Sequence, residues 1–414
     1  MINRIWVILI TLLLLCSNNV WATVSGQCSN CHTMHNSQNG TLDTTLSGDN
    51  VDNVNRSLTK GDCVGCHTGD IVDSIVDKIP YIMSTSGSEY GPDYADDGSL
   101  LNAAATNTLA GGTFNYVRDD ATQDSYAHNV SNIRAGKDSN MTDFTPPGWE
   151  ATTFEPATGG GSESVSAVAD SWGTTQLTCA GTNGCHGNHT NPDDFGDIRG
   201  AHHGDDSTID GSSVAKSFRF LRGILGQEDA EWELNVSTEA HNIYYGVDRT
   251  STATPGDKQT ISYLCAECHG MFHGSDATDD TGIIYDGPSV DNANPWLRHP
   301  TDFSLSTTGT DTEYLDYAKA DADAANADGG TLYNYIAPLA SSRKSSFNND
   351  GSNGITISNP FATTGDDIVT CLSCHRAHGS KYPDLLRWDY TKMQASASGG
   401  FANKGCFACH TSKD

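Results

Sequence analysis

The chain has 414 residues, and its 52 acidic against 23 basic side chains give a net charge of −29. This charge argues against a nucleic acid as the partner, because phosphate binding depends on a basic surface. Only 36% of the residues are hydrophobic, whereas 42 are glycine. The chain is therefore short of side chains for an aliphatic core, and something other than aliphatic packing must organise the fold.

The N-terminus has the pattern of a secretory signal peptide. A start carrying Arg4 is followed by an apolar run over residues 5–15, and Val20-Trp21-Ala22 has the small-residue spacing of a cleavage site. We expect residues 1–22 to be removed and residues 23–414 to form a single exported domain. No later apolar run is long enough to cross a bilayer, so we expect no membrane span.

Regular secondary structure is predicted only in short pieces. Long stretches rich in Gly, Ser, Thr, Asp and Asn are typical of loops. Hydrophobic periodicity predicts helices over Ile71–Ile79, Val214–Leu225, Tyr314–Ala327 and Pro383–Met393, and strands over Trp172–Thr178 and Ile355–Ser358. The predicted fold class is thus mostly irregular chain with short α-helices and a few small β-strands.

The cysteines carry the clearest chemical signal. Five segments have the pattern Cys-x-x-Cys-His, at Cys28/Cys31/His32, Cys63/Cys66/His67, Cys265/Cys268/His269, Cys371/Cys374/His375 and Cys406/Cys409/His410. This pattern is a c-type haem attachment signature. The two thiols reach the two vinyl groups of one porphyrin, and the following imidazole, here called the attachment histidine, then lies under the iron.

Disulfides, thioredoxin-like redox pairs and zinc sites are the alternatives for such cysteines. A disulfide framework gives no reason for the histidine that follows each pair. Thioredoxin-like pairs are not expected to recur five times in one chain, and zinc sites do not require a trailing imidazole. Haem attachment is therefore the favoured interpretation, with the fold wrapped around the cofactors.

A sixth cysteine pair departs from the pattern. Cys179 and Cys185 have five residues between them before His186, and they are the only cysteines left once Cys16 of the signal peptide is set aside. Two glycines in this insertion let the chain loop out so that both thiols still reach one haem. Attachment through Cys185 alone and a plain disulfide are the alternatives. A count of six haems uses every cysteine of the exported chain.

Counting histidines narrows the choice of second axial ligands. Nine histidines lie outside the six attachment motifs, and six irons with two histidines each need six of them. Four of the nine follow an attachment histidine by three or four residues, namely His35, His189, His378 and His273. Residues at this spacing share one face of a helical turn, so each is better placed to ligate a different haem packed alongside. Met34 and Met271 are the alternative ligands, and Met ligation would raise a reduction potential.

Two isolated histidines complete the predicted set. His128 and His299 stand in long stretches without an attachment motif, and we expect both to bind iron because six irons need ligands. The adjacent His202 and His203, together with His241, are then the expected surplus. The predicted distal ligands are His35, His128, His189, His273, His299 and His378.

The motif segments resemble the OmcS-type extracellular hexahaem c-type cytochromes, the cytochrome nanowire filament family. The resemblance rests on Cys28 to Asn36, Cys371 to His378 and the Cys409-His410 ending, with further similarity at Phe220–Gly226, Cys265–His273 and Leu297–Pro300. The intervening loops match poorly.

This resemblance implies a loop-built subunit around a serial chain of haems, alternately stacked and perpendicular, with subunits joined head to tail. In that family the histidine just after the first motif ligates a haem of the neighbouring subunit, and His35 occupies the matching position. We therefore expect secretion to the outer surface, self-assembly, electron exchange with other redox proteins or extracellular acceptors, and no enzymatic activity. A monomeric periplasmic shuttle and a multihaem oxyanion reductase with one open axial position are the alternatives.

Overall fold

The protein is described by a computed structural model, which covers residues 27–34, 37–38, 41–42, 58–59, 63–67, 75–76, 79–83, 108–109, 111–118, 121–131, 133, 145–147, 176–191, 194–204, 208–228, 233–235, 240–248, 257–269, 299, 301–305, 337–343, 367–393 and 405–410. Its α-helices are α2 (Cys63–His67), α3 (Asn115–Arg118), α4 (Asp194–Asp197) and α5 (Ile261–Ala266). The 3₁₀ turns are η1 (Cys28–Asn30), η3 (Ala121–Tyr126), η4 (Ala201–His203), η5 (Val214–Lys216), η6 (Phe218–Phe220), η7 (Asp257–Gln259), η12 (Cys371–Ser373), η13 (Pro383–Leu385), η14 (Tyr390–Lys392) and η15 (Gly405–Ala408).

The strands are as short as the helices. They are β1 (Ser37–Gln38), β2 (Thr41–Leu42), β3 (Ile75–Val76), β4 (Ile79–Pro80), β5 (Thr108–Leu109), β6 (Thr178–Ala180), β7 (Gly184–His186), β8 (Gly226–Gln227), β9 (Glu233–Asn235), β10 (Ala240–His241), β11 (Ile243–Tyr244), β12 (Phe303–Ser304) and β13 (Ile368–Val369). The sheets are β1-β2, β3-β4, β6-β7, β8-β11, β12-β13 and the three-stranded β10-β9-β5. The predicted fold class, loop with short helices and small strands, is confirmed for the described residues.

Two of the predicted helices are wrong in detail. Within Ile71–Ile79, the described residues form the hairpin β3–β4, because β-branched Ile and Val on either side of a two-residue turn favour strands. Within Val214–Leu225, the chain forms two 3₁₀ turns instead of one helix, and it leaves helical geometry at Arg219, whose φ is 48°.

The C-terminal prediction fails for a similar reason. Pro383–Met393 contains the separate turns η13 and η14, and Asp384 inside η13 has a φ of 61°. Of the strand predicted over Trp172–Thr178, residues 172–175 lie outside the described residues, and β6 begins at Thr178. The predictions over residues 1–22, 314–327 and 355–358 lie outside the described residues.

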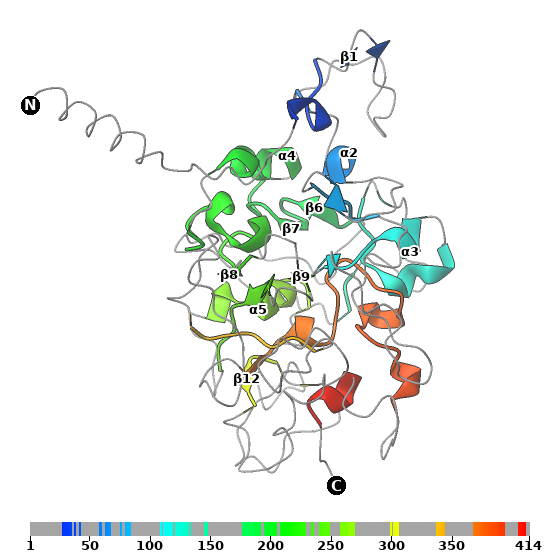
Figure 1. Ribbon diagram of the computed structural model, residues 1–414, viewed down its shortest axis with the longest axis vertical. Helices are drawn as coiled ribbons and strands as arrows, with labels where there is room; N and C mark the ends of the chain where they lie inside the picture. Colours follow the sequence, from blue (N-terminus) through cyan, green and yellow to red (C-terminus); the bar gives the residue numbers. More distant parts are fainter. Residues whose placement is uncertain are drawn as a thin grey trace, which may run out of the picture.

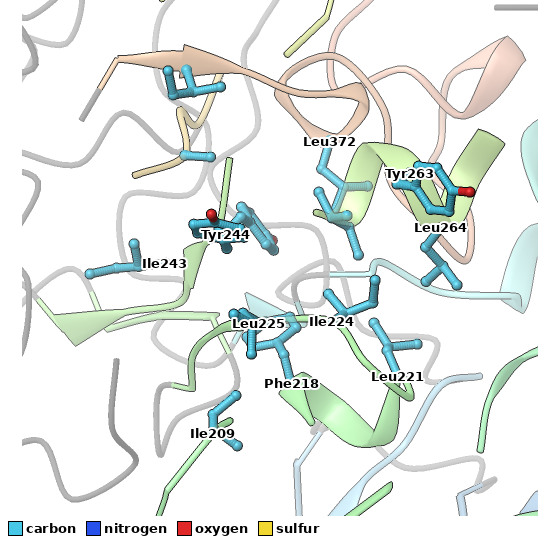
Figure 2. Packing of buried hydrophobic residues seen from close by; sticks show 14 residues of the cluster. Ile209, Phe218, Leu221, Ile224, Leu225, Ile243, Tyr244, Tyr263, Leu264 and Leu372 are labelled. Atoms are coloured by element: carbon cyan, nitrogen blue, oxygen red, sulfur yellow. The ribbon is translucent and has the colours of Figure 1, made fainter. Parts of the chain in front are cut away.

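Hydrophobic packing is concentrated in two clusters that contain parts of the cysteine motifs. The larger cluster joins residues 209–225, β11, α5 and residues 368–372. Figure 2 shows Leu372 and the α5 residues Tyr263 and Leu264 at one end of this cluster. The smaller cluster consists of Val64, Met83, Phe114, Val117, Ala127, Val130 and Ile133. Leu264, Leu372 and Val64 each lie next to a motif cysteine in the chain, so the packed clusters hold these motifs in place.

The motifs succeed one another along the long axis of the molecule. Figure 1 shows the blue N-terminal segment with β1 at the top and the red C-terminal turn η15 near the bottom. The motifs at α2, at β6–β7 and at α5 lie between these ends (Figure 1). Within the ranges given above, no helix is both long and apolar enough to span a bilayer.

Candidate haem-binding sites

The five regular motifs share one backbone design. Each is built on a helical turn, namely η1, α2, the end of α5, η12 and η15. The backbone N–H of the attachment histidine donates to the carbonyl of the first motif cysteine, for example from His269 to Cys265 at 2.9 Å and from His410 to Cys406 at 3.0 Å. This bond closes a turn of α-helical type. The turn brings the attachment histidine back beside the first thiol.

The expanded motif, third in chain order, also brings its histidine beside its cysteines but by a different backbone path. Its cysteines lie on β6 and β7, which pair in parallel and align Ala180 with His186. Gly181 has a φ of +87°, and a Cβ on Gly184 would lie 2.5 Å from the Ala180 nitrogen. Both glycines are therefore required by the loop geometry, as the sequence predicts.

The alternatives to haem attachment find no support in the described residues. All twelve motif cysteines have free thiols there, so Cys179 and Cys185 form no disulfide with each other. A structural zinc site needs four converging ligands. Within the described ranges, no group of three or more His, Cys, Asp or Glu side chains is arranged to hold a metal ion.

Backbone carbonyls fix the rings of the attachment histidines. The Nδ1–carbonyl pairs are His32 with Leu58 at 3.1 Å, His67 with Pro80 at 3.0 Å, His186 with Arg219 at 2.9 Å, His269 with Pro147 at 2.7 Å and His375 with Asp384 at 2.7 Å. Because a carbonyl only accepts, Nδ1 carries the proton in each ring. Nε2 then keeps its lone pair, which is the form of imidazole that ligates iron.

Five attachment histidines have a second histidine ring opposite them. The pairs and their centroid separations are His32–His203 at 6.1 Å, His67–His202 at 6.3 Å, His186–His378 at 6.2 Å, His128–His269 at 6.1 Å and His299–His410 at 6.1 Å. Two imidazoles that ligate one metal ion have centroids about 6 Å apart, since each adds about 2 Å of metal–nitrogen bond and about 1 Å from nitrogen to ring centre. The five pairs therefore fit an iron between the rings.

Three of these second rings belong to the predicted distal set, and two do not. His128, His299 and His378 lie opposite attachment histidines. His202 and His203, expected to be surplus, do so as well. They are adjacent in the 3₁₀ turn η4, where successive side chains point about 120° apart, so the two rings reach different attachment histidines. His35 and His273 lie outside the described residues.

His189 occupies a different environment from the one predicted. Its Nδ1 lies 3.0 Å from Oε2 of Glu267, and its Nε2 lies 3.2 Å from the carbonyl oxygen of Cys185. Both partners are acceptors, so both ring nitrogens donate and neither offers a lone pair to a metal. The ligand set that we propose below therefore leaves His189 out.

The pKa values of the paired rings and of His189 are shifted in opposite directions. Burial, with a smaller contribution from His186, lowers the pKa of His378 to about 3. Burial, together with neighbouring histidines, also lowers the pKa of His202 and of His269 to about 4. These rings are neutral, as ligation requires. For His189, burial lowers the pKa, but the hydrogen bond and charge of Glu267, together with the Cys185 carbonyl and Asp197, raise it, and the net shift is upward.

His375 differs from the other attachment histidines. Its ring is oriented by the Asp384 carbonyl, as the rings of His32, His67, His186 and His269 are by other carbonyls. The residue is exposed, and no second histidine ring lies opposite it in the part of the chain that the structure describes.

Motifs that are neighbours in sequence are also neighbours in space. The Cys66 thiol lies 3.8 Å from the Cys31 carbonyl oxygen, and the Cys265 thiol donates a hydrogen bond to the sulfur of Cys371. Burial and then the nearby Cys406 raise the pKa of Cys374 to about 12, which places the last two motifs side by side. The attachment sites therefore follow one another as a series.

Two strained dipeptides serve the attachment histidines of the third and fifth motifs. Arg219-Phe220 and Asp384-Leu385 have left-handed φ values of 48° and 60°, and of 61° and 57°. In each case the first carbonyl meets Nδ1 of the attachment histidine, and the second accepts from the next backbone N–H, that of Gly187 or Arg376, at 2.7 Å. We call these two segments the left-handed clamps. The Leu-Arg pair that follows each clamp is the sequence signal that could have identified them.

Gly111 is a second feature that the sequence analysis missed. A Cβ on Gly111 would lie 2.7 Å from Nδ1 of His378, so only glycine leaves room for this ring. Phe114 covers the ring with a centroid separation of 4.9 Å. Gly111 and Phe114 therefore form the slot that holds His378 opposite His186.

Comparison with known proteins agrees with this chemistry. Residues 360–414 match a family model described as Doubled CXXCH motif. No curated protein matches the chain. The chain is similar to the outer membrane cytochrome S filament from Geobacter sulfurreducens, with 17% identity over 89% of this chain and 85% of that chain and a TM-score of 0.40. It is similar to OmcS nanowires from Geobacter sulfurreducens, solved by cryo-electron microscopy, with 18% identity, 88% and 84% coverage and a TM-score of 0.40.

The doubled motif and the residues around it define a chain that binds c-type haem covalently. The matched segment contains the fifth and sixth motifs, with their two Cys-x-x-Cys-His sequences. The oriented attachment histidines and the facing rings described above fit that group.

Proposed function

We propose that this chain is an exported multihaem cytochrome that transfers electrons through six covalently attached c-type haems and assembles head to tail with copies of itself. The facing histidine pairs, 6.1 to 6.3 Å apart, are the observation that carries the proposal. Haem supplies a reversible one-electron iron couple when bound. The chain's own residues attach that group, hold two neutral imidazoles in line and set the spacing between successive sites.

The proposed ligand set revises the one expected from the sequence. Each attachment histidine pairs with one second ligand: His32 with His203, His67 with His202, His186 with His378, His269 with His128, His410 with His299, and His375 with His35 of a neighbouring copy. His189, His241 and His273 are then the surplus. All twelve motif cysteines, including Cys179 and Cys185, attach haem.

Head-to-tail assembly is supported by exposed residues near the first and the fifth motifs. His35 directly follows Met34, whose side chain is 67% exposed, and Leu58 beside it is 47% exposed. His375 is exposed as well, and so is Tyr390, at 67%. The blue N-terminal segment and the red C-terminal turn lie apart in Figure 1. A contact between unlike patches propagates into a filament unless its rotation closes a ring.

A second candidate function rests on the exposure of His375. If no neighbouring copy supplies a ligand to the site of His375, that position stays open to a small molecule, as in a multihaem reductase. A monomeric shuttle is the other possibility, with every iron ligated from within one chain. We favour the filament because His35 follows the exposed Met34 in the chain and occupies the position that, in the family the motifs resemble, ligates a haem of the neighbouring subunit.

The test is His35→Ala in the full exported chain, with Met34→Leu as the matched control. The proposal predicts that the wild type and Met34→Leu form long filaments with every iron low-spin. It predicts that His35→Ala remains short and gains one high-spin iron that binds cyanide. Long filaments of His35→Ala with every iron low-spin would contradict the cross-subunit role. Cyanide binding by the wild-type filament would favour the open-site alternative.

A further inference from the structure

The buried pair formed by His189 and Glu267 joins two consecutive attachment motifs. His189 follows the expanded motif Cys179–His186, and Glu267 lies between the two cysteines of the next motif. Their Nδ1 and Oε2 atoms are 3.0 Å apart, and each side chain is only 9% exposed. The other ring nitrogen of His189 reaches the Cys185 carbonyl oxygen at 3.2 Å. One imidazole therefore bridges the backbone of one motif and a side chain of the other.

We propose that His189 and Glu267 are a positioning pair that fixes the third attachment site against the fourth. This inference rests on the proposed multihaem function. Neither residue touches iron in this account. Instead, the pair sets the separation and relative orientation of two successive haems, and so the electronic contact between them.

The expanded motif has a particular need for such a link. The regular motifs are held by an α-helical turn in which the histidine N–H meets the first cysteine carbonyl. In the expanded motif the cysteines lie on the separate strands β6 and β7, joined by an insertion that contains Gly181 and Gly184. Glycines widen the range of backbone conformations open to a loop. An external anchor on Cys185 restricts the end of this loop that carries the second thiol.

Burial explains why Glu267 is paired with His189. A carboxylate buried to this extent is costly unless it is paired and hydrogen-bonded. The hydrogen bond to Glu267 is charge-assisted, which makes it shorter and stronger than a neutral one. Burial and then the charge of Glu267 raise the pKa of the Cys185 thiol to about 11, so the carboxylate lies close to the third site as well as within the fourth motif.

The chain provides a matched control for an experiment. His189 follows His186 by three residues, and His378 follows His375 by three residues. The ring of His378 lies 6.2 Å from the ring of His186, whereas the ring of His189 is hydrogen-bonded to Glu267. The same substitution at the two positions therefore distinguishes a positioning residue from an iron ligand.

The variants are His189→Gln, Glu267→Gln, their double mutant and the control His378→Gln, each as the full haem-loaded chain. Spin state, the Soret circular-dichroism couplet that reports haem–haem orientation, and the midpoint potentials are measured. We expect His189→Gln and Glu267→Gln each to keep all irons low-spin, change the couplet and shift two of the potentials. The double mutant should change little beyond either single one, because both break one link. His378→Gln should instead produce one high-spin iron.

Two outcomes would overturn the inference. A high-spin iron in His189→Gln would make His189 a ligand, and an unchanged couplet with unchanged potentials in both Gln variants would leave the pair no positioning role. Failure of the underlying function is distinguishable, since it would appear in the wild type as missing haems or a high-spin iron. If His189→Gln does not load haem, Glu267→Gln decides alone, because it leaves the anchoring histidine on Cys185.

Discussion

His189 and His378 stand at the same spacing after an attachment histidine, yet the structure gives them opposite surroundings. His378 lies in a slot made by Gly111 and Phe114, and its ring faces that of His186. His189 is bonded on both ring nitrogens, to Glu267 and to the Cys185 backbone. Spacing alone therefore does not make a histidine a ligand. The neighbours decide, because an acceptor on each nitrogen removes the lone pair and an apolar slot keeps the ring neutral.

The largest effect is expected from removing the imidazole ring of His378, which we propose as an iron ligand. His378→Ala should convert one of the irons from low-spin to high-spin and allow it to bind cyanide, because His186 would be left as its only ligand. Magnetic circular dichroism in the near infrared measures this change. The paired variant His189→Ala should leave every iron low-spin, and a high-spin signal there would erase the distinction between the two histidines.

An intermediate effect is expected from narrowing the slot. In Gly111→Ala the new methyl group would sit 2.7 Å from Nδ1 of His378, so the ring must move. We expect a mixture of low-spin and high-spin states at that one site and a lower melting temperature. Gly200→Ala is the control, since a Cβ there meets nothing within 4 Å and only the φ of +78° opposes it. A fully low-spin Gly111→Ala protein would show that the slot does not position His378.

The smallest effect is expected from changing the left-handed clamp Asp384-Leu385, which orients the ring of His375. Leu385 has a left-handed φ of 57°, whereas Leu386 next to it has a φ of −67°. A non-glycine residue in left-handed geometry costs about 1–2 kcal/mol. Leu385→Gly should therefore be more stable than Leu385→Ala by about 1 kcal/mol.

The order should reverse at Leu386, where Ala suits the backbone better than Gly. Reversible unfolding of the four variants, followed by the Soret band, measures both differences. Equal stabilities of Leu385→Gly and Leu385→Ala would mean that the left-handed clamp is not strained.

The sequence was sufficient for the attachment chemistry and the fold class. Each Cys-x-x-Cys-His segment folds as a local turn, so its role can be read from adjacent residues. The loop-rich architecture follows from the abundance of glycine and the scarcity of apolar side chains. The helices predicted over Ile71–Ile79 and Val214–Leu225 were wrong, because apolar spacing does not reveal a hairpin turn or a left-handed residue such as Arg219.

The pairing of histidines could not be predicted in the same way. His203 reaches His32 and His128 reaches His269 across long stretches of chain, so their partners depend on tertiary packing. Adjacent His202 and His203 looked redundant in sequence, but a 3₁₀ turn points them at different sites. No pattern in the sequence predicts the contact between Glu267 and His189. Only the three-dimensional contacts distinguish a histidine placed to bind iron from one, such as His189, that links two motifs by hydrogen bonds.

Near-infrared magnetic circular dichroism of the intact oxidised filament, calibrated per polypeptide, tests the proposed ligation of all six irons. Its charge-transfer bands count irons ligated by two histidines. The account predicts six such irons per chain and no high-spin iron, because each attachment histidine has a facing ring within the chain or from a neighbouring copy. Five would remove the expanded site at Cys179 and Cys185, and a persistent high-spin iron in the filament would contradict the proposed ligation of His375.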